Sequence, residues 1–214
     1  MRIVRSERKR GVLVNQRVRT GQRNLQLPYL PPEDWHEPTE KQTGKFKVVV
    51  REPGKGYRHV LTAEDVRNRL AQLPRHFLDN LEVVQFSQMT RKKSGFPCYG
   101  MQWGGTLYLY PIEQSLVEEY ECAPTPAQRI EARMYGGEWT QIATNKWQLT
   151  WTEEGIRDFY LNNILIHELG HLVDTRNTKY HDREKYAEWF AIEYGYRATS
   201  RPGKVRKSHV QRHG

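Results

Sequence analysis

The sequence predicts an α+β domain in which a small mixed or antiparallel sheet packs on a helix. Strand-like segments begin at residue 45, one helical segment is interposed among them, and helical patterns follow toward the C-terminus. The chain has 214 residues, with 6 Trp, 12 Tyr and 6 Phe, which is enough to build a core without disulfides. Residues 45–196 are therefore expected to form one folded domain.

The sheet is expected to begin with "KFKVVV" at residues 45–50, followed by "YRHVL" at residues 57–61. Gly54 and Gly56 lie between them and suit a tight reversal, so these segments read as strand, turn, strand. Further strands are expected at "LEVVQFSQMT", "GTLYLYPI" and "KWQLTW", which alternate or run apolar. Gly104 and Gly105 suit a turn before the second of these.

Helices are predicted where a capping residue precedes an apolar stripe. Thr62 and Asp65 have the spacing of a capping box, and Val66, Leu70 and Leu73 follow on one helical face. Another helix is expected to open at Thr125 and Pro126 and to end at Gly136 and Gly137. Thr152 is expected to cap a long helix that runs to residue 174.

Positive charge is concentrated at the two ends of the chain. Residues 1–23 hold eight Lys or Arg and one acid, residues 197–214 hold six and none, and the whole chain carries +9, so residues 24–196 carry −4. We expect a basic, Pro-containing N-terminal extension over residues 1–44 and a basic C-terminal tail over residues 197–214. Such tails either contact nucleic acid weakly or are solvated ends.

The composition predicts a cytoplasmic protein without a membrane span. No apolar run approaches the roughly 20 residues that a spanning helix needs. The N-terminus lacks the apolar core of a secretory signal, although its Arg-rich, acid-poor composition also resembles an organelle transit peptide. Cys98 and Cys122 form no CxxC pair and are expected to be free thiols.

The stretch "LIHELGHLVD" at residues 165–174 carries the strongest chemical signal. A four-residue step on a helix places His167 and His171 about 40° apart on one face, so both imidazoles can bind one ion. Glu168 is turned by about 100° and can reach a water beside that ion, which is the geometry behind the HExxH motif. The same helix carries an apolar stripe, Leu161, Leu165, Leu169 and Leu172, on a different face.

A second acidic helix is expected soon after the first, with Asp182 as its N-cap. Two His and one Glu are the ligand set of a catalytic zinc site, in which a fourth position is left for water. Glu184, His181 and Glu188 are the candidates for the third ligand. Asp174 is expected either to end the first helix or to hydrogen-bond a metal ligand and so orient it.

These motifs resemble those of the gluzincin branch of the zincin metallopeptidases, over about 25 residues. "HELGHLVD" with "EKYAEWF" is most similar to the subgroup of the anthrax lethal factor catalytic domain and the Pro-Pro endopeptidases. The resemblance implies a zincin-like fold, His167, His171 and Glu184 as zinc ligands, and Glu168 as the general base. It also implies that Glu188 contacts one of the two ligating histidines and holds its ring in position.

The expected function is zinc-dependent hydrolysis of a peptide or protein substrate. The subgroup's transition-state tyrosine falls at Asn177 here, which leaves Tyr180 and His181 as candidates for stabilising the oxyanion. A substrate strand could add to a sheet edge formed by "TLYLY" or "KWQLTW".

Two other readings stay open. One is a catalytically silent zincin-fold binding module whose basic tails contact nucleic acid or an acidic partner. The other is a site that resembles peptide deformylases, with Cys122 as a ligand. The sequence does not predict the oligomeric state.

Overall fold

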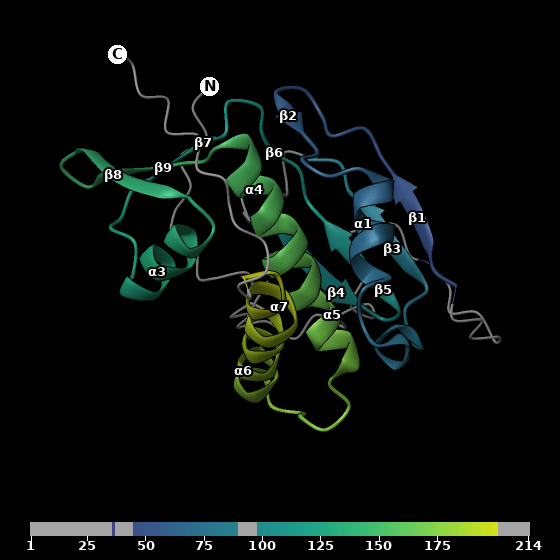
Figure 1. Cartoon of the computed structure of the whole chain (residues 1–214). Coiled ribbons are helices and arrows are strands. Elements are labelled where there is room, and N and C mark those ends of the chain that lie inside the picture. The colour runs from purple at the N-terminus through teal and green to yellow at the C-terminus, as the bar shows by residue number, and fades with distance from the viewer. Residues whose placement is uncertain (1–35, 37–44, 90–97, 201–214) are drawn as a thin grey trace, which may run out of the picture.

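The computed structural model describes residues 36, 45–89 and 98–200, which form helices and small sheets and confirm the predicted α+β class (Figure 1). The strands are β1 Lys47–Val50, β2 Tyr57–Arg58, β3 Val83–Phe86, β4 Gly100–Trp103, β5 Thr106–Leu109, β6 Ile112–Glu113, β7 Val117–Tyr120, β8 Glu138–Ala143 and β9 Lys146–Thr150. The helical segments are α1 Ala63–Leu70, η1 Arg75–Leu78, α3 Pro126–Met134, α4 Glu153–Phe159, η2 Tyr160–Ile164, α5 Leu165–Val173, α6 Tyr180–Phe190, η3 Ala191–Tyr196 and α7 Arg197–Ser200.

The largest sheet has four strands in the order β1-β3-β5-β4. β1, β3 and β5 are parallel, whereas β4 pairs antiparallel with β5. All four residues of β3 and of β5 are buried, as is usual for strands covered on both faces. β4 was not predicted; it is joined to β5 by a turn in which Gly104 has a φ of +56°. The sheet is therefore mixed, and β4 lies at its edge.

The predicted strand, turn, strand at residues 45–61 is only partly correct. Gly54 and Gly56 do adopt positive φ, and Tyr57 N donates to Gly54 O over 3.1 Å. However, β1 pairs with β3 and β2 pairs with β6, so the two strands belong to different sheets. The fully buried β3 needs a neighbour on each side, and β1 provides one of them through a parallel crossover that contains α1.

A second sheet of three antiparallel strands has the order β7-β9-β8. β9 was predicted, but β7 and β8 were not. In β7 the inward positions are Glu118 and Tyr120, with Glu118 fully buried, so the usual apolar alternation is broken by a carboxylate. β8 is almost wholly exposed, so it carries no apolar alternation either.

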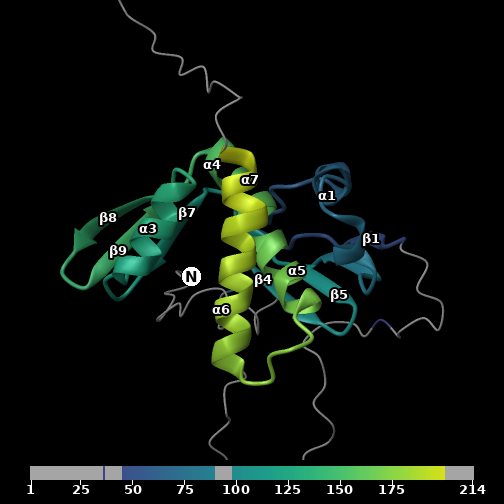
Figure 2. The same ribbon diagram turned by 60° about the horizontal axis from the view of Figure 1, so that its bottom comes forward.

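Two long helical runs lie between the sheets (Figures 1 and 2). One run is α4, η2 and α5, which follow without a break from Glu153 to Val173, with Thr152 as the predicted cap. The other is α6, η3 and α7. The π-helical turn η2 keeps Asn162 O against Gly195, where an added Cβ would lie only 1.8 Å from that oxygen. The two runs therefore approach closely because position 195 has no side chain.

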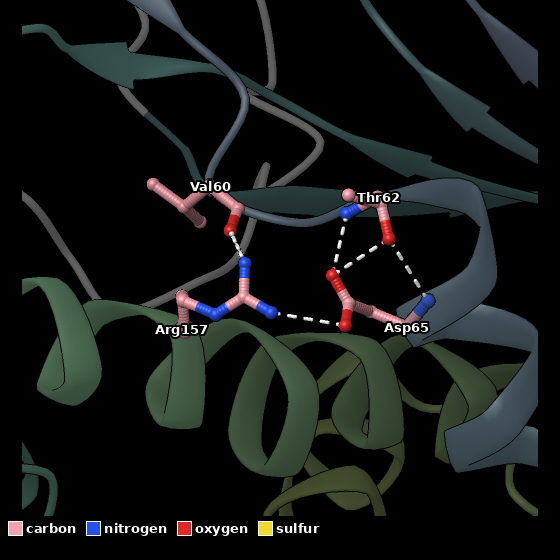
Figure 3. Close-up of polar contacts among 4 residues, drawn as sticks. All are labelled: Val60, Thr62, Asp65 and Arg157. Carbon is pink, nitrogen blue, oxygen red and sulfur yellow. Dashed lines mark hydrogen bonds and ion pairs between the residues drawn. The ribbon is translucent and has the colours of Figure 1, made fainter.

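The predicted capping box of α1 is present and also holds α4. Asp65 N donates to the Thr62 hydroxyl over 3.1 Å, and Thr62 N donates to the Asp65 carboxylate over 2.7 Å. Arg157 of α4 donates to the other Asp65 oxygen over 2.9 Å and to Val60 O over 2.8 Å (Figure 3). Burial favours a raised pKa for Asp65, but the bonds from Thr62 and the Arg157 charge outweigh it and lower that pKa.

Several predictions concern the chain ends. The basic segments 1–23 and 201–214 lie outside the described residues, as does most of residues 24–44. His36 is described, and its ring contacts Gln85 Oε1 of β3 at 2.8 Å. The second helical run continues to Ser200, past the predicted start of the tail. Within the described ranges, no helix combines the length and apolar character needed to cross a bilayer.

The second acidic helix begins earlier than predicted. α6 starts at Tyr180 with Lys179 as its N-cap, so Asp182 lies inside the first turn and is not the cap. Its carboxylate still lies near the positive end of the helix dipole. Tyr180 and His181 are consequently helical residues, about one turn before Glu184 on the same helix.

Replacing Thr62 with alanine should lower the free energy of unfolding by about 1 kcal/mol, because the α1 cap is lost. Thr144→Ala is the matched control, since Thr144 is exposed in the β8–β9 turn. Urea denaturation of the two variants measures the difference. Equal stability of the two variants would contradict a role for the box in the fold.

Candidate functional site

His167, His171 and Glu184 bring three potential metal-ligand atoms together, all within 4.8 Å of one another. The two Nε2 atoms of the histidines are 3.1 Å apart. Glu184 Oε1 lies 3.3 Å from His171 Nε2, and Oε2 lies 3.7 Å from His167 Nε2. Within the described residues this is the one group of three or more His, Cys, Asp or Glu with such proximity.

The geometry follows from how α5 and α6 pack. The i, i+4 spacing on α5 brings the two histidine rings together edge to face, and α6 crosses next to them. The crossing is close at Gly170, where an added Cβ would lie 3.0 Å from both Ala187 Cα and Phe190 Cβ. Gly170 lies within the HExxH motif and Ala187 within "EKYAEWF", so the two motifs contact each other directly at the crossing.

The three side chains fit a divalent cation. Two nitrogens bound to zinc at about 2.0–2.1 Å in tetrahedral geometry lie about 3.3 Å apart, close to the observed 3.1 Å. Glu184 Oε2 is buried and accepts no hydrogen bond within the described structure, and an uncompensated buried carboxylate oxygen is costly. A cation at this point would satisfy that oxygen.

The imidazoles differ in their protonation. Burial, together with the charges of His167 and Arg183, lowers the pKa of His171 to about 3, so this ring is neutral as a metal ligand must be. Burial opposes a charge on His167, but the carboxylates of Glu184 and Glu168 outweigh it and raise the pKa of that ring. The two neighbouring rings therefore differ in how readily they take up a proton.

Glu168 is only 3% exposed and lies beside the edge strand β4. Burial raises its pKa to about 8, although the charge of His167 and a hydrogen bond from the Gln102 backbone act in the opposite direction. An added Cβ at Gly100 of β4 would lie 2.9 Å from both Glu168 Cγ and Oε1. The absence of a side chain at position 100 thus makes room for the Glu168 carboxylate.

Arg183, which the sequence analysis did not single out, ties the three elements around the site. Its guanidinium donates to His171 O over 3.1 Å and to Gln102 Oε1 over 3.4 Å. No known motif places an arginine one residue before a candidate ligand, so the sequence offers no signal for Arg183. Only its position on α6 shows that it contacts both α5 and β4. It holds α6, α5 and β4 together at the end of α5 that carries His171.

The other predicted site residues occupy different places. Tyr180 is 43% exposed; burial together with Glu184, Glu188 and Glu168 raises the pKa of its phenol, which places the phenol within reach of the site's charges. His181 is exposed, and neither it nor Glu188 belongs to the ligand group. Asp174 is the C-cap of α5 and accepts bonds from Arg176 N, Asn177 N and the Asn177 amide.

The cysteines do not join the group. Cys98 and Cys122 are both free and partly buried, as predicted for thiols that form no disulfide. The ligand group among the described residues contains no sulfur, so nothing in the structure supports Cys122 as a ligand.

A cavity of about 50 Å³ opens beside His167 and Glu168. Five aromatic side chains line it, namely Tyr99, Tyr120, Trp139, Trp151 and Phe159. Trp151 stacks on Phe159 with ring centroids 4.8 Å apart. Glu131 of α3 and Glu188 of α6 also line the cavity, and Glu131 accepts a hydrogen bond from the Asn163 amide over 2.9 Å.

Behind these rings, a carboxylate holds the cavity wall together. Glu118 is fully buried, and its Oε2 accepts hydrogen bonds from the Tyr99 hydroxyl, the Tyr120 hydroxyl and Trp151 Nε1. A buried carboxylate needs such donors to offset the loss of hydration. Glu118 therefore fixes three of the five aromatic side chains in place.

Comparison with known proteins identifies no relative. No protein-family model matches the chain, no curated protein matches it, and no solved structure resembles it significantly.

Glu168→Gln should stabilise the metal-free protein increasingly as the pH rises. The folded carboxyl has a pKa of about 8 against 4.5 for the ordinary group, so the wild type loses stability as pH rises between these values, whereas the amide does not titrate. The expected gain at pH 8.5 relative to pH 5 is on the order of a few kcal/mol.

Urea denaturation at both pH values, with a chelator present, measures this gain. Glu154→Gln on the exposed start of α4 is the matched charge control. If wild type and Glu168→Gln keep the same stability difference at both pH values, the buried-carboxyl account is wrong.

Proposed function

We propose that the chain is a zinc-dependent metallopeptidase of the gluzincin type, with His167, His171 and Glu184 as the zinc ligands and Glu168 as the general base. The observation that carries the proposal is the convergence of the three donor atoms from α5 and α6, with one carboxylate oxygen left unsatisfied. Two imidazoles and one carboxylate are a ligand set of catalytic zinc sites.

Zinc held by these residues would supply Lewis acidity, which lowers the pKa of a water to about 7 and polarises a scissile carbonyl. Glu168 takes a proton from the attacking water and passes it to the departing amine. Its buried position beside β4 suits this task, because a base with a pKa near neutrality can both accept and return a proton.

Tyr180 is the candidate for stabilising the oxyanion. It lies one helical turn before Glu184, so its side chain projects from the same face of α6. Burial together with Glu184, Glu188 and Glu168 raises the pKa of its phenol, which therefore stays protonated and able to donate a hydrogen bond at neutral pH. Tyr180 and His181 are both exposed, and Tyr180 is favoured because the carboxylates around the site act on the pKa of its phenol.

The substrate is proposed to bind as an extended strand beside β4. Among the described strands β4 pairs with β5 alone, and it passes Glu168 at Gly100. A strand edge next to a proteolytic site can pair with the peptide backbone of a substrate. Of the two sheet edges considered from the sequence, neither is favoured: "TLYLY" is the inner strand β5 and "KWQLTW" is the central strand β9.

The environment of Glu168 favours a peptidase over a silent binding module. A buried carboxyl with a raised pKa is destabilising when it ionises, and a module that only binds a partner gains nothing from keeping it. The basic tails on which the nucleic-acid alternative depends lie almost wholly outside the described residues.

Glu184→Ala should bind zinc at least about 100-fold more weakly than the wild type, because a ligand is removed. His181→Ala and Glu188→Ala are the matched controls on the same helix, and both should retain zinc. Elemental analysis and competition with a chelator measure the affinity. Equal zinc affinity in all three variants would exclude Glu184 as the ligand.

Gly100→Ala should lower kcat/KM for a peptide substrate about 100-fold, because the added methyl crowds Ile164 Cγ2 at 2.8 Å and the Glu168 side chain at 2.9 Å, and so displaces the carboxylate. Gly105→Ala is the control on the same hairpin, where a Cβ would crowd Glu82 Cγ at 2.9 Å, away from the site. Rates are compared at equal zinc content. A loss of activity of the same size in both variants would mean that the effect comes from the hairpin and not from Glu168.

A further inference from the structure

The backbone of β4 alternates between groups that pair with β5 and groups that face the other side of the strand. Tyr110 N donates to Tyr99 O over 2.9 Å, so these two opposite residues form a hydrogen-bonded pair of the antiparallel ladder. Bonded and non-bonded pairs alternate along such a ladder, so the pairs that contain Gly100 and Gln102 are non-bonded. The backbone N–H and C=O groups of Gly100 and Gln102 therefore point away from β5.

One of these outward groups already has a partner, which is the carboxylate of Glu168. The backbone N–H of Gln102 donates a hydrogen bond to it. Glu168 is buried and lies against Gly100, where an added Cβ would meet its Oε1 at 2.9 Å. The carboxylate thus occupies the edge of β4 to which a peptide strand would add.

The two acceptors compete because one backbone N–H supplies one donor. Among the described strands β4 pairs with β5 alone, so a peptide strand that pairs with the opposite edge uses the N–H of Gln102. That strand has to displace the Glu168 carboxylate. The displaced carboxylate loses a donor and is left to accept a hydrogen bond from another group, such as a water molecule.

The side chain of Gln102 is anchored independently of its backbone N–H. Its Nε2 donates to Gly104 O over 2.7 Å, and its Oε1 accepts from Arg183 over 3.4 Å. Arg183 also donates to His171 O over 3.1 Å, which ties β4 to α5 and α6. These bonds stay in place when the N–H changes its partner, so β4 keeps its position beside the site.

We propose that Glu168 and a substrate strand compete for the backbone N–H of Gln102, so that strand pairing at β4 releases the general base toward the metal-ligand group. The base is held on β4 until a peptide long enough to pair with this edge has bound. The catalytic consequence rests on the peptidase proposed above, whereas the competition is measured without turnover.

Binding is tested with an acetylated hexapeptide amide of alternating alanine and threonine. It is titrated into the full-length, isotope-labelled protein with a chelator present, and the Gln102 amide is followed by NMR. Glu168→Ala removes the competing acceptor and should bind the peptide about threefold to tenfold more tightly than the wild type. Glu154→Ala, at an exposed position of α4, is the matched control and should bind as the wild type does. Unchanged or weaker binding by Glu168→Ala, or no shift of the Gln102 amide, would overturn the proposal.

Gln102→Pro and Gln102→Ala separate the backbone N–H from the side chain. Both remove the side-chain bonds, but only proline removes the N–H, at an edge position that faces away from the paired strand. Glu168→Ala should therefore still tighten peptide binding in the alanine background and have no effect on it in the proline background. Equal tightening in both backgrounds would mean that this N–H is not the shared group.

Hydrogen exchange of the Gln102 amide provides a measurement that does not depend on the folding of the proline variant. The amide should be protected in the wild type, exchange faster in Glu168→Ala, and regain protection when the peptide is added to that variant. Equal exchange in the wild type and Glu168→Ala, or no renewed protection, would contradict the competition.

A cleavage arm separates the two proposals. Casein is digested with the zinc-loaded protein to locate a cleaved site, and peptides of four, six and eight residues centred on that site are then compared. The value of kcat should rise with length in the wild type and in Gln102→Ala, but not in Gln102→Pro. Cleavage in which length changes KM alone would overturn the competition and leave the peptidase standing. Competition for the N–H without cleavage of casein would support this inference and count against the peptidase.

Discussion

The close crossing of α5 and α6 is the constraint on which the rest of the structure depends. Gly170 allows Ala187 and Phe190 to approach α5 so closely that a methyl group there would already crowd them. At that separation, Glu184 reaches His171 at 3.3 Å. A wider crossing would move the carboxylate away from the imidazoles, since side chains of this length cannot span another layer of packing. Gly195 enforces the same closeness further along the helices, against η2.

Buried charge is the second organising feature, and it is concentrated around this crossing. Glu168 is buried beside β4, Glu118 is buried beneath the aromatic wall, and both histidines are nearly covered. Burial of each charge is unfavourable unless partners compensate for it. Glu118 receives three hydrogen bonds, whereas Glu168 receives one from a backbone amide and keeps a raised pKa. The contrast separates a carboxylate that stabilises the structure from the one for which we propose a role in proton transfer.

The two sheets serve different purposes around the helices. The mixed sheet presents β4, whose Gly100 lies against Glu168, and Arg183 joins this strand to α6 through Gln102. The antiparallel sheet presents Trp139 and Tyr120 to the cavity. The proposed zinc site lies where these parts meet, with β4 on one side and the aromatic cavity on the other.

The sequence by itself determined the local features, because capping and helical spacing depend on neighbouring residues. It predicted the α1 capping box, the cap at Thr152 and the placement of His167 and His171 on one face of a helix. Glu184 as a zinc ligand stays a prediction; its carboxylate lies beside both rings. Tertiary packing decided the features that link distant segments. β1 and β2 lie in different sheets because β1 pairs with the buried strand β3. β7 was not predicted because its inward residue is the charged Glu118, whose hydrogen-bond donors Tyr99 and Trp151 come from elsewhere in the chain. The roles of Gly100 and Arg183, and the cavity beside His167, likewise arise from contacts across many residues, which no local pattern encodes.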